Sequence, residues 1–276
     1  MPITDSKKAA VLGWPVSHSL SPRLHNYWLR QYDIKGSYDA IATEPENLKR
    51  VLLQLQEKGY VGANLTLPHK EQAISLMDSL DEKAKRIGAV NTILMKDGKM
   101  VGKNTDAYGF IENLKSSDVA VAEKKSLVLG AGGAARAVCA GLMEENCEII
   151  LTNRTRGKAE LLAASLKGNI TVIDWAEIEQ VLHTIHLLVN TTSLGMKGQQ
   201  PLDLMLDALP KEAVVTDIVY SPLITPLLKT AQAQKLKTVD GLGMLLYQAQ
   251  PAFEAWFGVK PEVTSGLRTH MLAGFS

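Results

Sequence analysis

Three short polar clusters in the first half of the chain carry groups that could bind a carboxylate and transfer a proton. Hydroxyls recur at 17–22 (SHSLSP), where a helix is predicted to begin, and a helix start favours a bound carboxylate. The cluster at 64–70 (NLTLPHK) ends in an amine, which can stabilise a developing oxyanion and supply a proton. The cluster at 104–106 (NTD) ends in a carboxylate. Taken singly, each also fits a structural role: an N-cap at Ser21, a solvated lysine at Lys70 and an N-cap at 104–106.

A glycine-rich turn at 130–135 (GAGGAA) matches the pattern G-x-G-x-x-A between a predicted strand and a predicted helix. In this pattern Gly130 permits the tight turn, Gly132 lets the backbone approach a pyrophosphate, and Ala135 allows close helix packing. Unpaired N–H groups at the helix start would then face the anion. The turn therefore predicts a dinucleotide site, with a close-packed turn that binds nothing as the alternative.

The residues after the next predicted strand favour NADP over NAD. An NAD site usually has an acidic residue about 20 positions after the turn, bonded to the ribose. This chain has Asn153-Arg154-Thr155 there, 23 positions after Gly130 (153 minus 130). A guanidinium matches the oxygens of a 2′-phosphate, and Arg156 and Lys158 add positive charge. The alternative is a solvated basic loop that opens a surface helix.

The elements that must position these groups alternate as parallel α/β units do. Strands are predicted at 9–12, 37–42, 59–65, 126–129, 148–152, 170–173, 186–190 and 214–219. Helices are predicted near 22–32, 45–58, 70–80 and 241–257, with a further one from the glycine-rich turn to about 145. Asp97-Gly98 predicts a hairpin turn, and the polar stretch 115–125 predicts a domain boundary.

Composition excludes several classes of function. With 30 Lys and Arg against 29 Asp and Glu, the chain has no overall field to hold nucleic acid or an anionic membrane. The apolar run 127–143 is interrupted by glycines and an arginine, so no membrane span is predicted. Two cysteines and a start without a signal-peptide core predict a reduced, cytoplasmic protein. The histidines are scattered, so no metal site is predicted.

A set of longer motifs follows in order along the chain. The motifs are Gly13-x-Pro15-x-x-His18-Ser19-x-Ser21-Pro22, Asn64-x-Thr66-x-Pro68-x-Lys70, Gly88-Ala89-Val90-Asn91-Thr92, Gly102-x-Asn104-Thr105-Asp106, the glycine-rich turn, Asn153-Arg154-Thr155, Asn190-Thr191-Thr192 and Asp240-Gly241-Leu242. With them the sequence resembles the shikimate dehydrogenases over roughly residues 11–257.

The resemblance implies the reversible, NADPH-dependent reduction of 3-dehydroshikimate to shikimate, on the way to chorismate and the aromatic amino acids. It also implies two α/β domains. An N-terminal substrate domain would span 1–115 and be rejoined by C-terminal helices at about 241–276, and a Rossmann NADP-binding domain would span 116–240. A monomer and a homodimer both remain open.

Carried over by motif, Ser19 and Ser21 would hold the substrate carboxylate, and Lys70 and Asp106 would form the catalytic pair and contact the substrate. The other substrate residues would be Thr66, Asn91, Tyr220 and Gln248. The cofactor residues would be Gly130, Ala131, Gly132, Gly133, Ala134, Asn153, Arg154, Thr155, Arg156 and Lys158, with Glu82, Ile218 and Gly241 as weaker positional matches. Lys158 stands where the family often has Arg, so NADP preference would depend mainly on Arg154.

Three other functions remain open at this point. The first is a quinate/shikimate dehydrogenase that uses NAD, against which Asn153-Arg154-Thr155 argues. The second is a non-catalytic NADP-binding sensor, which would have no need of Lys70 and Asp106. The third is an enzyme like methylenetetrahydrofolate dehydrogenase, which also pairs two lobes around a lysine. The two serines at 19 and 21 favour a small acidic substrate instead.

Overall fold

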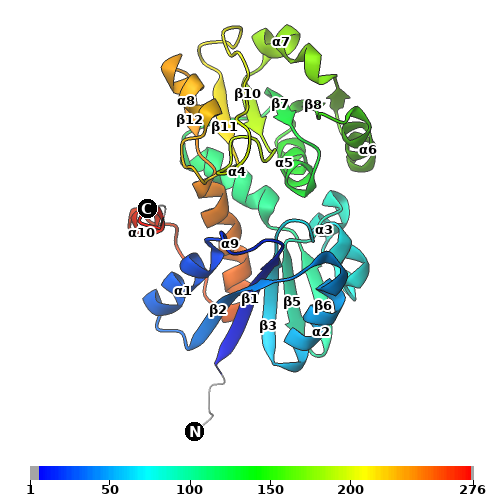
Figure 1. Ribbon diagram of the computed structural model, residues 1–276, viewed down its shortest axis with the longest axis vertical. Helices are drawn as coiled ribbons and strands as arrows, with labels where there is room; N and C mark the ends of the chain where they lie inside the picture. The colour runs from blue at the N-terminus through cyan, green and yellow to red at the C-terminus, as the bar shows by residue number, and fades with distance from the viewer. Residues whose placement is uncertain (1–5, 275–276) are drawn as a thin grey trace. The chain divides into compact units, whose positions relative to one another are not determined.

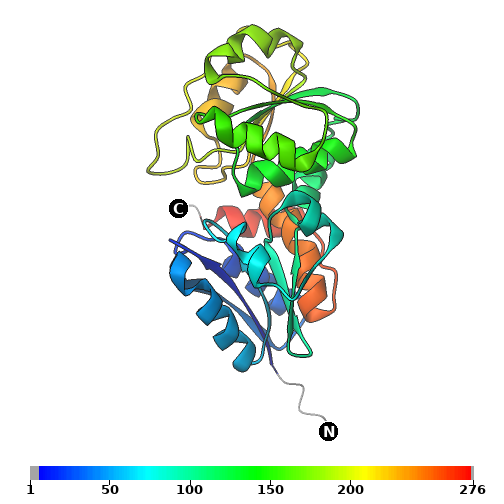
Figure 2. The same ribbon diagram turned by 90° about the vertical axis from the view of Figure 1, so that its right-hand side faces the viewer.

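A computed structural model describes residues 6–274, which form two compact units (Figure 1 and Figure 2). One unit holds the chain up to Thr105 and again from Leu246, and the other holds Asp106–Leu245. Each unit contains its own six-stranded sheet. The predicted domain limits, 115/116 and 240/241, differ from these unit limits by the helix that opens at Asp106 and by the first residues after 240.

The sheet of the first unit is mixed, in the order β2-β1-β3-β5-β6-β4. Its strands are β1 (Lys7–Gly13), β2 (Gly36–Ala42), β3 (Tyr60–Leu65), β4 (Ser79–Leu80), β5 (Thr92–Lys96) and β6 (Lys99–Lys103). β1 pairs in parallel with β2 and β3, whereas β5 runs antiparallel to β3 and β6. The predicted hairpin is confirmed, since Asp97 and Gly98 join β5 to β6 with φ of 52° and 72°.

The helices of the first unit pack an aliphatic and an aromatic cluster around this sheet. They are α1 (Ser21–Gln31), α2 (Leu48–Glu57), α3 (Glu82–Ile87) and α10 (Ser265–Leu272), with most of α9 (Leu242–Phe257) and the short 3-10 turns η1 (Pro45–Asn47) and η2 (Gln72–Leu76). On the aliphatic side, Leu48 and Leu52 of α2 pack in one cluster with Leu12 and Leu65. On the aromatic side, the indole of Trp256 from α9 lies so close to Gly62 of β3 that a Cβ at Gly62 would collide with it.

The predicted helix at 70–80 is wrong. The chain forms only the 3-10 turn Gln72–Leu76 and then the short strand β4. Asp78 explains the change, because its backbone N–H donates to the Met100 carbonyl (2.9 Å) and its carboxylate accepts from the Met100 N–H (2.7 Å). Pairing with β6 therefore replaces the helical bonds that the local pattern predicts.

The sheet of the second unit is entirely parallel, in the order β12-β11-β10-β7-β8-β9. Its strands are β7 (Lys125–Leu129), β8 (Glu148–Thr152), β9 (Ile170–Val172), β10 (Leu187–Asn190), β11 (Val214–Asp217) and β12 (Lys237–Val239). Its helices are α4 (Asp106–Ser116), α5 (Gly133–Glu144), α6 (Arg156–Leu166), α7 (Ile178–Val181) and α8 (Pro226–Ala233), with the 3-10 turns η3 (Trp175–Glu177) and η4 (Leu182–Thr184).

The parallel arrangement decides where the second unit can bind a ligand. The carboxyl ends of parallel strands lie at one edge of a sheet, and ligands of such sheets bind outside that edge. The glycine-rich turn follows β7, Asn153 follows β8 and Ile218 follows β11. The predicted cofactor residues that follow these strands therefore lie at a single edge.

Candidate active site

The two serines predicted to bind a carboxylate lie at the start of α1. The helix begins at Ser21 itself and its N-cap is Leu20, so the prediction that Ser21 is the N-cap is wrong. The Ser19 hydroxyl instead accepts a hydrogen bond from the Ser21 N–H (3.3 Å). That bond occupies a lone pair of Ser19 and leaves its O–H as a donor, while Ser21 is buried.

Asn91 is the centre of a buried group of polar side chains in the first unit. Its Nδ2 donates to Thr105 Oγ1 (2.9 Å) and to Gln248 Oε1 (3.3 Å), and its Oδ1 accepts from the Thr105 N–H (2.9 Å). These contacts join the residue before β5, the residue before α4 and a residue of α9. The structure thus brings together Asn91 and Gln248, two predicted substrate residues that lie 157 positions apart in the chain.

Two further members of this group are absent from the predicted site. Asn64, the penultimate residue of β3, donates through Nδ2 to the Asn91 carbonyl (3.0 Å) and to Thr92 Oγ1 (3.1 Å). Tyr38 of β2 donates its hydroxyl to Asn64 Oδ1 (2.6 Å). Asn64 opens one of the motifs listed above, which is a signal that could have found it, but nothing in the sequence around Tyr38 marks it.

Lys70 lies half-buried in the turn after β3, and contacts of Lys70 and His69 hold this turn in place. Its carbonyl accepts from the Val90 N–H (2.8 Å), so its backbone lies beside Asn91. His69 is buried, and its Nε2 lies 2.9 Å from the Thr43 carbonyl. Burial lowers the pKa of His69, so the neutral ring is favoured at this contact.

Asp106 is buried as the first residue of α4. It directly follows Thr105, whose backbone N–H is bonded to Asn91. The half-buried Thr66 donates its N–H to the Leu12 carbonyl (2.9 Å), so the predicted substrate threonine is fixed beside β1.

The glycine-rich turn has the backbone that a pyrophosphate site needs. Gly130 has a φ of +113°, which glycine adopts readily, and a Cβ there would press on the Thr191 hydroxyl. Gly132 is the N-cap of α5, and no side chain caps this helix. A Cβ built on the exposed Gly132 would meet nothing within 4 Å, so an anion can approach the backbone there. The residues present therefore fit a dinucleotide.

The basic residues after β8 differ in how they are held. Arg154 and Lys158 are exposed. Arg156 is paired through Nε to Glu160 (2.8 Å) and through Nη1 to Asp174 (2.8 Å), and these bonds raise the pKa of its guanidinium. Arg154 and Lys158 therefore present charge to solvent, while two carboxylates compensate the charge of Arg156.

Asp217, at the end of β11, organises the same edge of the sheet and was not predicted. It is fully buried and accepts from Asn190 Nδ2 (3.0 Å), the Val219 N–H (3.0 Å) and the Thr225 hydroxyl (2.7 Å). Burial, opposed by these donors, raises the pKa of the carboxyl. The cluster holds the segments after β10 and β11, which contain the predicted residues Ile218 and Tyr220.

The remaining predicted cofactor residues have simpler surroundings. Gly241 follows β12 and lies so close to the Ile218 carbonyl that a Cβ would collide with it. Glu82 is exposed in the first turn of α3 and forms an ion pair with Lys85 (2.7 Å), in the first unit.

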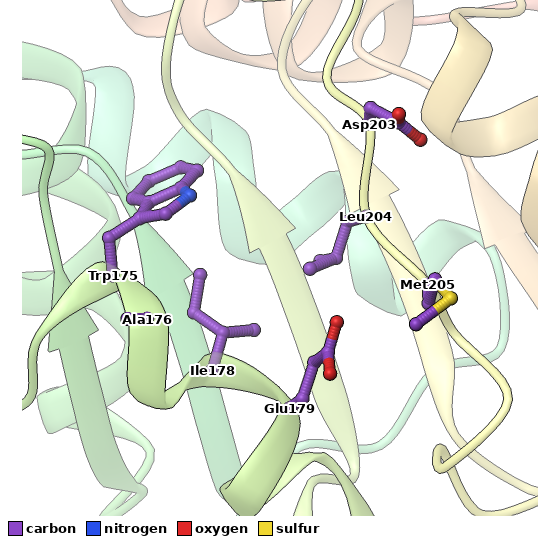
Figure 3. A pocket seen from close by; sticks show the side chains of 7 residues that line it. All are labelled: Trp175, Ala176, Ile178, Glu179, Asp203, Leu204 and Met205. Atoms are coloured by element: carbon purple, nitrogen blue, oxygen red, sulfur yellow. The ribbon is translucent and has the colours of Figure 1, made fainter.

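A separate pocket in the second unit does not coincide with any of these residues. It has a volume of about 330 Å³ (Figure 3). It is lined by Trp175, Ala176, Ile178, Glu179, Asp203, Leu204 and Met205. The charged residues of this lining are both acidic, so the pocket suits neither a substrate carboxylate nor a cofactor phosphate.

Residues 6–274 contain neither a candidate membrane-spanning helix nor a candidate metal site. No helix among these residues is long and apolar enough to cross a bilayer. Within the same range, no group of three or more His, Cys, Asp and Glu side chains is arranged to hold a metal ion.

The fold and the site together define a class of protein. The second unit is a Rossmann-type dinucleotide-binding unit, and the first carries a buried hydroxyl and amide site with a lysine in the adjoining turn. A nicotinamide-dependent α/β dehydrogenase has this combination of parts.

Comparison with known proteins identifies the family. Residues 11–93 match the shikimate dehydrogenase substrate binding domain, residues 113–244 match the shikimate / quinate 5-dehydrogenase model, and residues 241–265 match the shikimate 5'-dehydrogenase C-terminal domain. The chain is 53% identical to a shikimate dehydrogenase (NADP(+)) of Rhodospirillum rubrum, covering 97% of each chain. It is 54% identical to that of Paramagnetospirillum magneticum, covering 97% of this chain and 99% of the relative.

A solved structure extends the likeness to three dimensions. Shikimate 5-dehydrogenase from Thermus thermophilus, in complex with NADP(H) and shikimate, superposes with a TM-score of 0.88 at 38% identity. The match covers 97% of this chain and 99% of that one. The chain belongs to the shikimate dehydrogenase family.

Proposed function

We propose that Lys70 and Asp106 are the catalytic pair of this chain, which is an NADP(+)-dependent shikimate dehydrogenase of the shikimate pathway. The reaction is the reversible reduction of 3-dehydroshikimate to shikimate. The observation that best supports the assignment is the bond between the Lys70 carbonyl and the Val90 N–H. It sets the lysine beside Asn91, whose side chain is bonded to the residue before Asp106.

Bound NADPH supplies the hydride to the carbonyl carbon of the substrate. Negative charge then builds on the carbonyl oxygen, and the Lys70 ammonium stabilises it and donates the proton that completes the hydroxyl. Asp106 accepts hydrogen bonds from the lysine and from the reacting hydroxyl, and so orients both. In the direction of oxidation, Lys70 takes the proton back.

The first unit binds the rest of the substrate. Ser19 and Ser21 donate to the carboxylate at the start of α1, where the helix dipole adds to the attraction. The ring hydroxyls are bound by Thr66, Asn91 and Gln248, with Tyr220 as a further substrate residue. A polyhydroxylated ring needs such paired donors and acceptors because each hydroxyl can both give and accept a hydrogen bond.

The second unit binds NADP. The backbone of Gly130, Ala131, Gly132, Gly133 and Ala134 cradles the pyrophosphate at the start of α5. Arg154 and Lys158 face the 2′-phosphate, with Asn153 and Thr155 shaping the loop. Arg156 completes the basic segment, although Glu160 and Asp174 share its charge. Ile218, Gly241 and Glu82 make further contacts to the cofactor.

A single assay tests this function. Nucleotide absorbance is followed with shikimate or quinate as substrate, each with NADP+ and with NAD+. The expected result is the highest kcat/KM for shikimate with NADP+. Turnover of quinate with NAD+ at an equal or higher kcat/KM would assign the chain to the quinate-oxidising alternative, and no turnover with any pair would overturn the assignment.

The assembly and location of the protein stay predictions. We propose a monomer or homodimer in the cytoplasm.

A further inference from the structure

Tyr38 lies on β2 with only 1% of its surface exposed, and its hydroxyl bonds to Asn64 in the buried polar group. The orientation of the Asn64 amide is fixed by its other contact. Its Nδ2 faces the backbone carbonyl of Asn91, and a carbonyl can only accept. Asn64 Oδ1 must therefore face Tyr38, and the phenol O–H must be the donor in the 2.6 Å bond.

Asn64 links the phenol to the next strand. Its Nδ2 also donates to Thr92 Oγ1 (3.1 Å), and Thr92 Oγ1 donates to Asn91 Oδ1 (3.0 Å). The Tyr38 hydroxyl is thus joined, through Asn64 and Thr92, to the amide of Asn91 that is proposed to bind a ring hydroxyl.

The position of Tyr38 is restrained at both its backbone and its ring. Asn26 of α1 donates to the Tyr38 carbonyl (2.7 Å) and accepts from the Tyr38 N–H (3.1 Å). The His25 ring stacks on the phenol with centroids 4.1 Å apart and planes 9° apart. A ring held this firmly can pass its position to the residues that it bonds.

We propose that Tyr38 is a positioning residue of the shikimate site, whose hydroxyl holds Asn64, and through Asn64 also Asn91, in the orientation that binds the substrate. The inference rests on the proposed assignment of Asn91 to shikimate. Tyr38 itself contacts neither substrate nor cofactor in this scheme, so its removal should affect shikimate binding and leave cofactor binding unchanged.

Tyr38→Phe tests the inference, because it removes the hydroxyl and keeps the stacked ring. The orphaned Asn64 oxygen should turn the amide away, and the KM for shikimate should rise about 10-fold. We expect kcat to change less than about 3-fold and the KM for NADP+ to stay the same. A purely structural role would lower the melting temperature without this selective change in the KM for shikimate.

Tyr60→Phe is the matched control. Tyr60 lies half-buried on β3 in the same sheet, where burial and the nearby Asp39 carboxylate raise the pKa of its hydroxyl. Removing its hydroxyl should leave both KM values unchanged.

A second variant keeps the inference falsifiable if Tyr38→Phe does not fold. Asn26→Ser frees the backbone of Tyr38 without touching its hydroxyl, and should raise the KM for shikimate about 3-fold, within the range of a lost hydrogen bond. The inference is overturned if the KM for shikimate stays within about 2-fold of the parent in the variants that fold, or if the KM for NADP+ rises equally. Failure of the proposed function would be distinct, since the parent enzyme itself would then not turn over shikimate.

Discussion

The candidate binding groups of the two units are opposite in kind. In the first unit they are buried and bonded to one another, as Asn91 and Gln248 show. In the second unit they are backbone N–H groups at an open helix start and exposed basic side chains such as Arg154.

The difference follows from the chemistry of the ligands. Uncharged ring hydroxyls compete poorly with water, so they need donors and acceptors that are already aligned in a dry site. Phosphates carry enough charge to be bound by a helix start and by solvated cations. Substitutions in the buried polar group around Asn91 should therefore lower both the stability of the fold and the affinity for the substrate. Substitutions at the proposed cofactor-binding edge of the second sheet should lower the affinity for the cofactor alone.

The largest effect is expected for Lys70→Ala. This variant tests whether the first unit takes part in the proton transfer as well as in substrate binding. Loss of the proton donor should lower kcat by roughly 100-fold, with a smaller change in shikimate affinity. Steady-state kinetics and direct shikimate binding measure the two effects. Lys49→Ala, an exposed lysine on α2, is the control. Near-normal turnover in Lys70→Ala would remove the residue from the mechanism.

Asn91→Ala tests whether the buried polar group around Asn91 also stabilises the fold. The change leaves the Thr105 N–H and the Gln248 side chain without this partner in a buried site, so the free energy of unfolding should fall by about 1–3 kcal/mol. The KM for shikimate should rise in the same variant. Urea unfolding and kinetics measure the two changes, and the exposed Asn169→Ala is the control. Unchanged stability would contradict the proposed contrast between the units.

Arg154→Ala is the counterpart in the second unit. Loss of a charge-assisted bond to the 2′-phosphate should raise the KM for NADP+ about 10-fold. The KM for NAD+ and, within about 0.5 kcal/mol, the free energy of unfolding should not change.

Arg156→Ala is the matched comparison for Arg154→Ala. Because Glu160 and Asp174 hold its guanidinium, its loss should change the KM for NADP+ by less than about 2-fold. Equal effects of the two substitutions would show that ion pairing does not distinguish these arginines.

The smallest effect concerns His25, the buried ring stacked on Tyr38. Burial lowers its pKa to about 3, from 6.5 in the unfolded chain. Below pH 6.5 the unfolded chain therefore binds a proton that the folded protein does not, so acid favours unfolding. From pH 7 to pH 6 this group should lower the free energy of unfolding by about 0.7 kcal/mol.

His25→Phe keeps an aromatic ring and should lose that part of the pH dependence. Urea unfolding of the parent and the variant at both pH values measures the difference, with the exposed His183→Asn as the control. Asp217 acts in the opposite sense, since burial raises its pKa and acid stabilises its folded form. Parallel plots of unfolding free energy against pH for the parent and His25→Phe would contradict this. They would show that His25 binds a proton as readily in the folded protein as in the unfolded chain.

Local patterns predicted the parts of the molecule that depend on neighbours in the chain. The glycine-rich turn is one, because its strand, tight turn and helix start are contiguous and each glycine has a backbone role. The hairpin at Asp97-Gly98 is another. The helix predicted at 70–80 failed for the converse reason, since the bonds of Asp78 to Met100 come from a strand about twenty residues further along.

The missed polar residues follow the same division. Tyr38 and Asp217 are single polar residues on or at the end of strands, and no spacing rule distinguishes them from ordinary strand residues. Asn64 opens a motif, but that motif does not show which groups Asn64 contacts. Their importance appears only when the partner strands are in place, because each is bonded to groups that the chain brings in from elsewhere.

The sequence by itself determined the family, the α/β class, the two kinds of anion site and the candidate catalytic pair, since all of these depend on residue types at short, fixed spacings. The tertiary structure alone decided that Tyr38 bonds to Asn64, that Gln248 reaches Asn91 across 157 positions, and that Arg156 is paired with Asp174. These are long-range contacts or contacts of side-chain geometry. They are set by which surfaces the packed sheets and helices bring together, and no local pattern of residues records that.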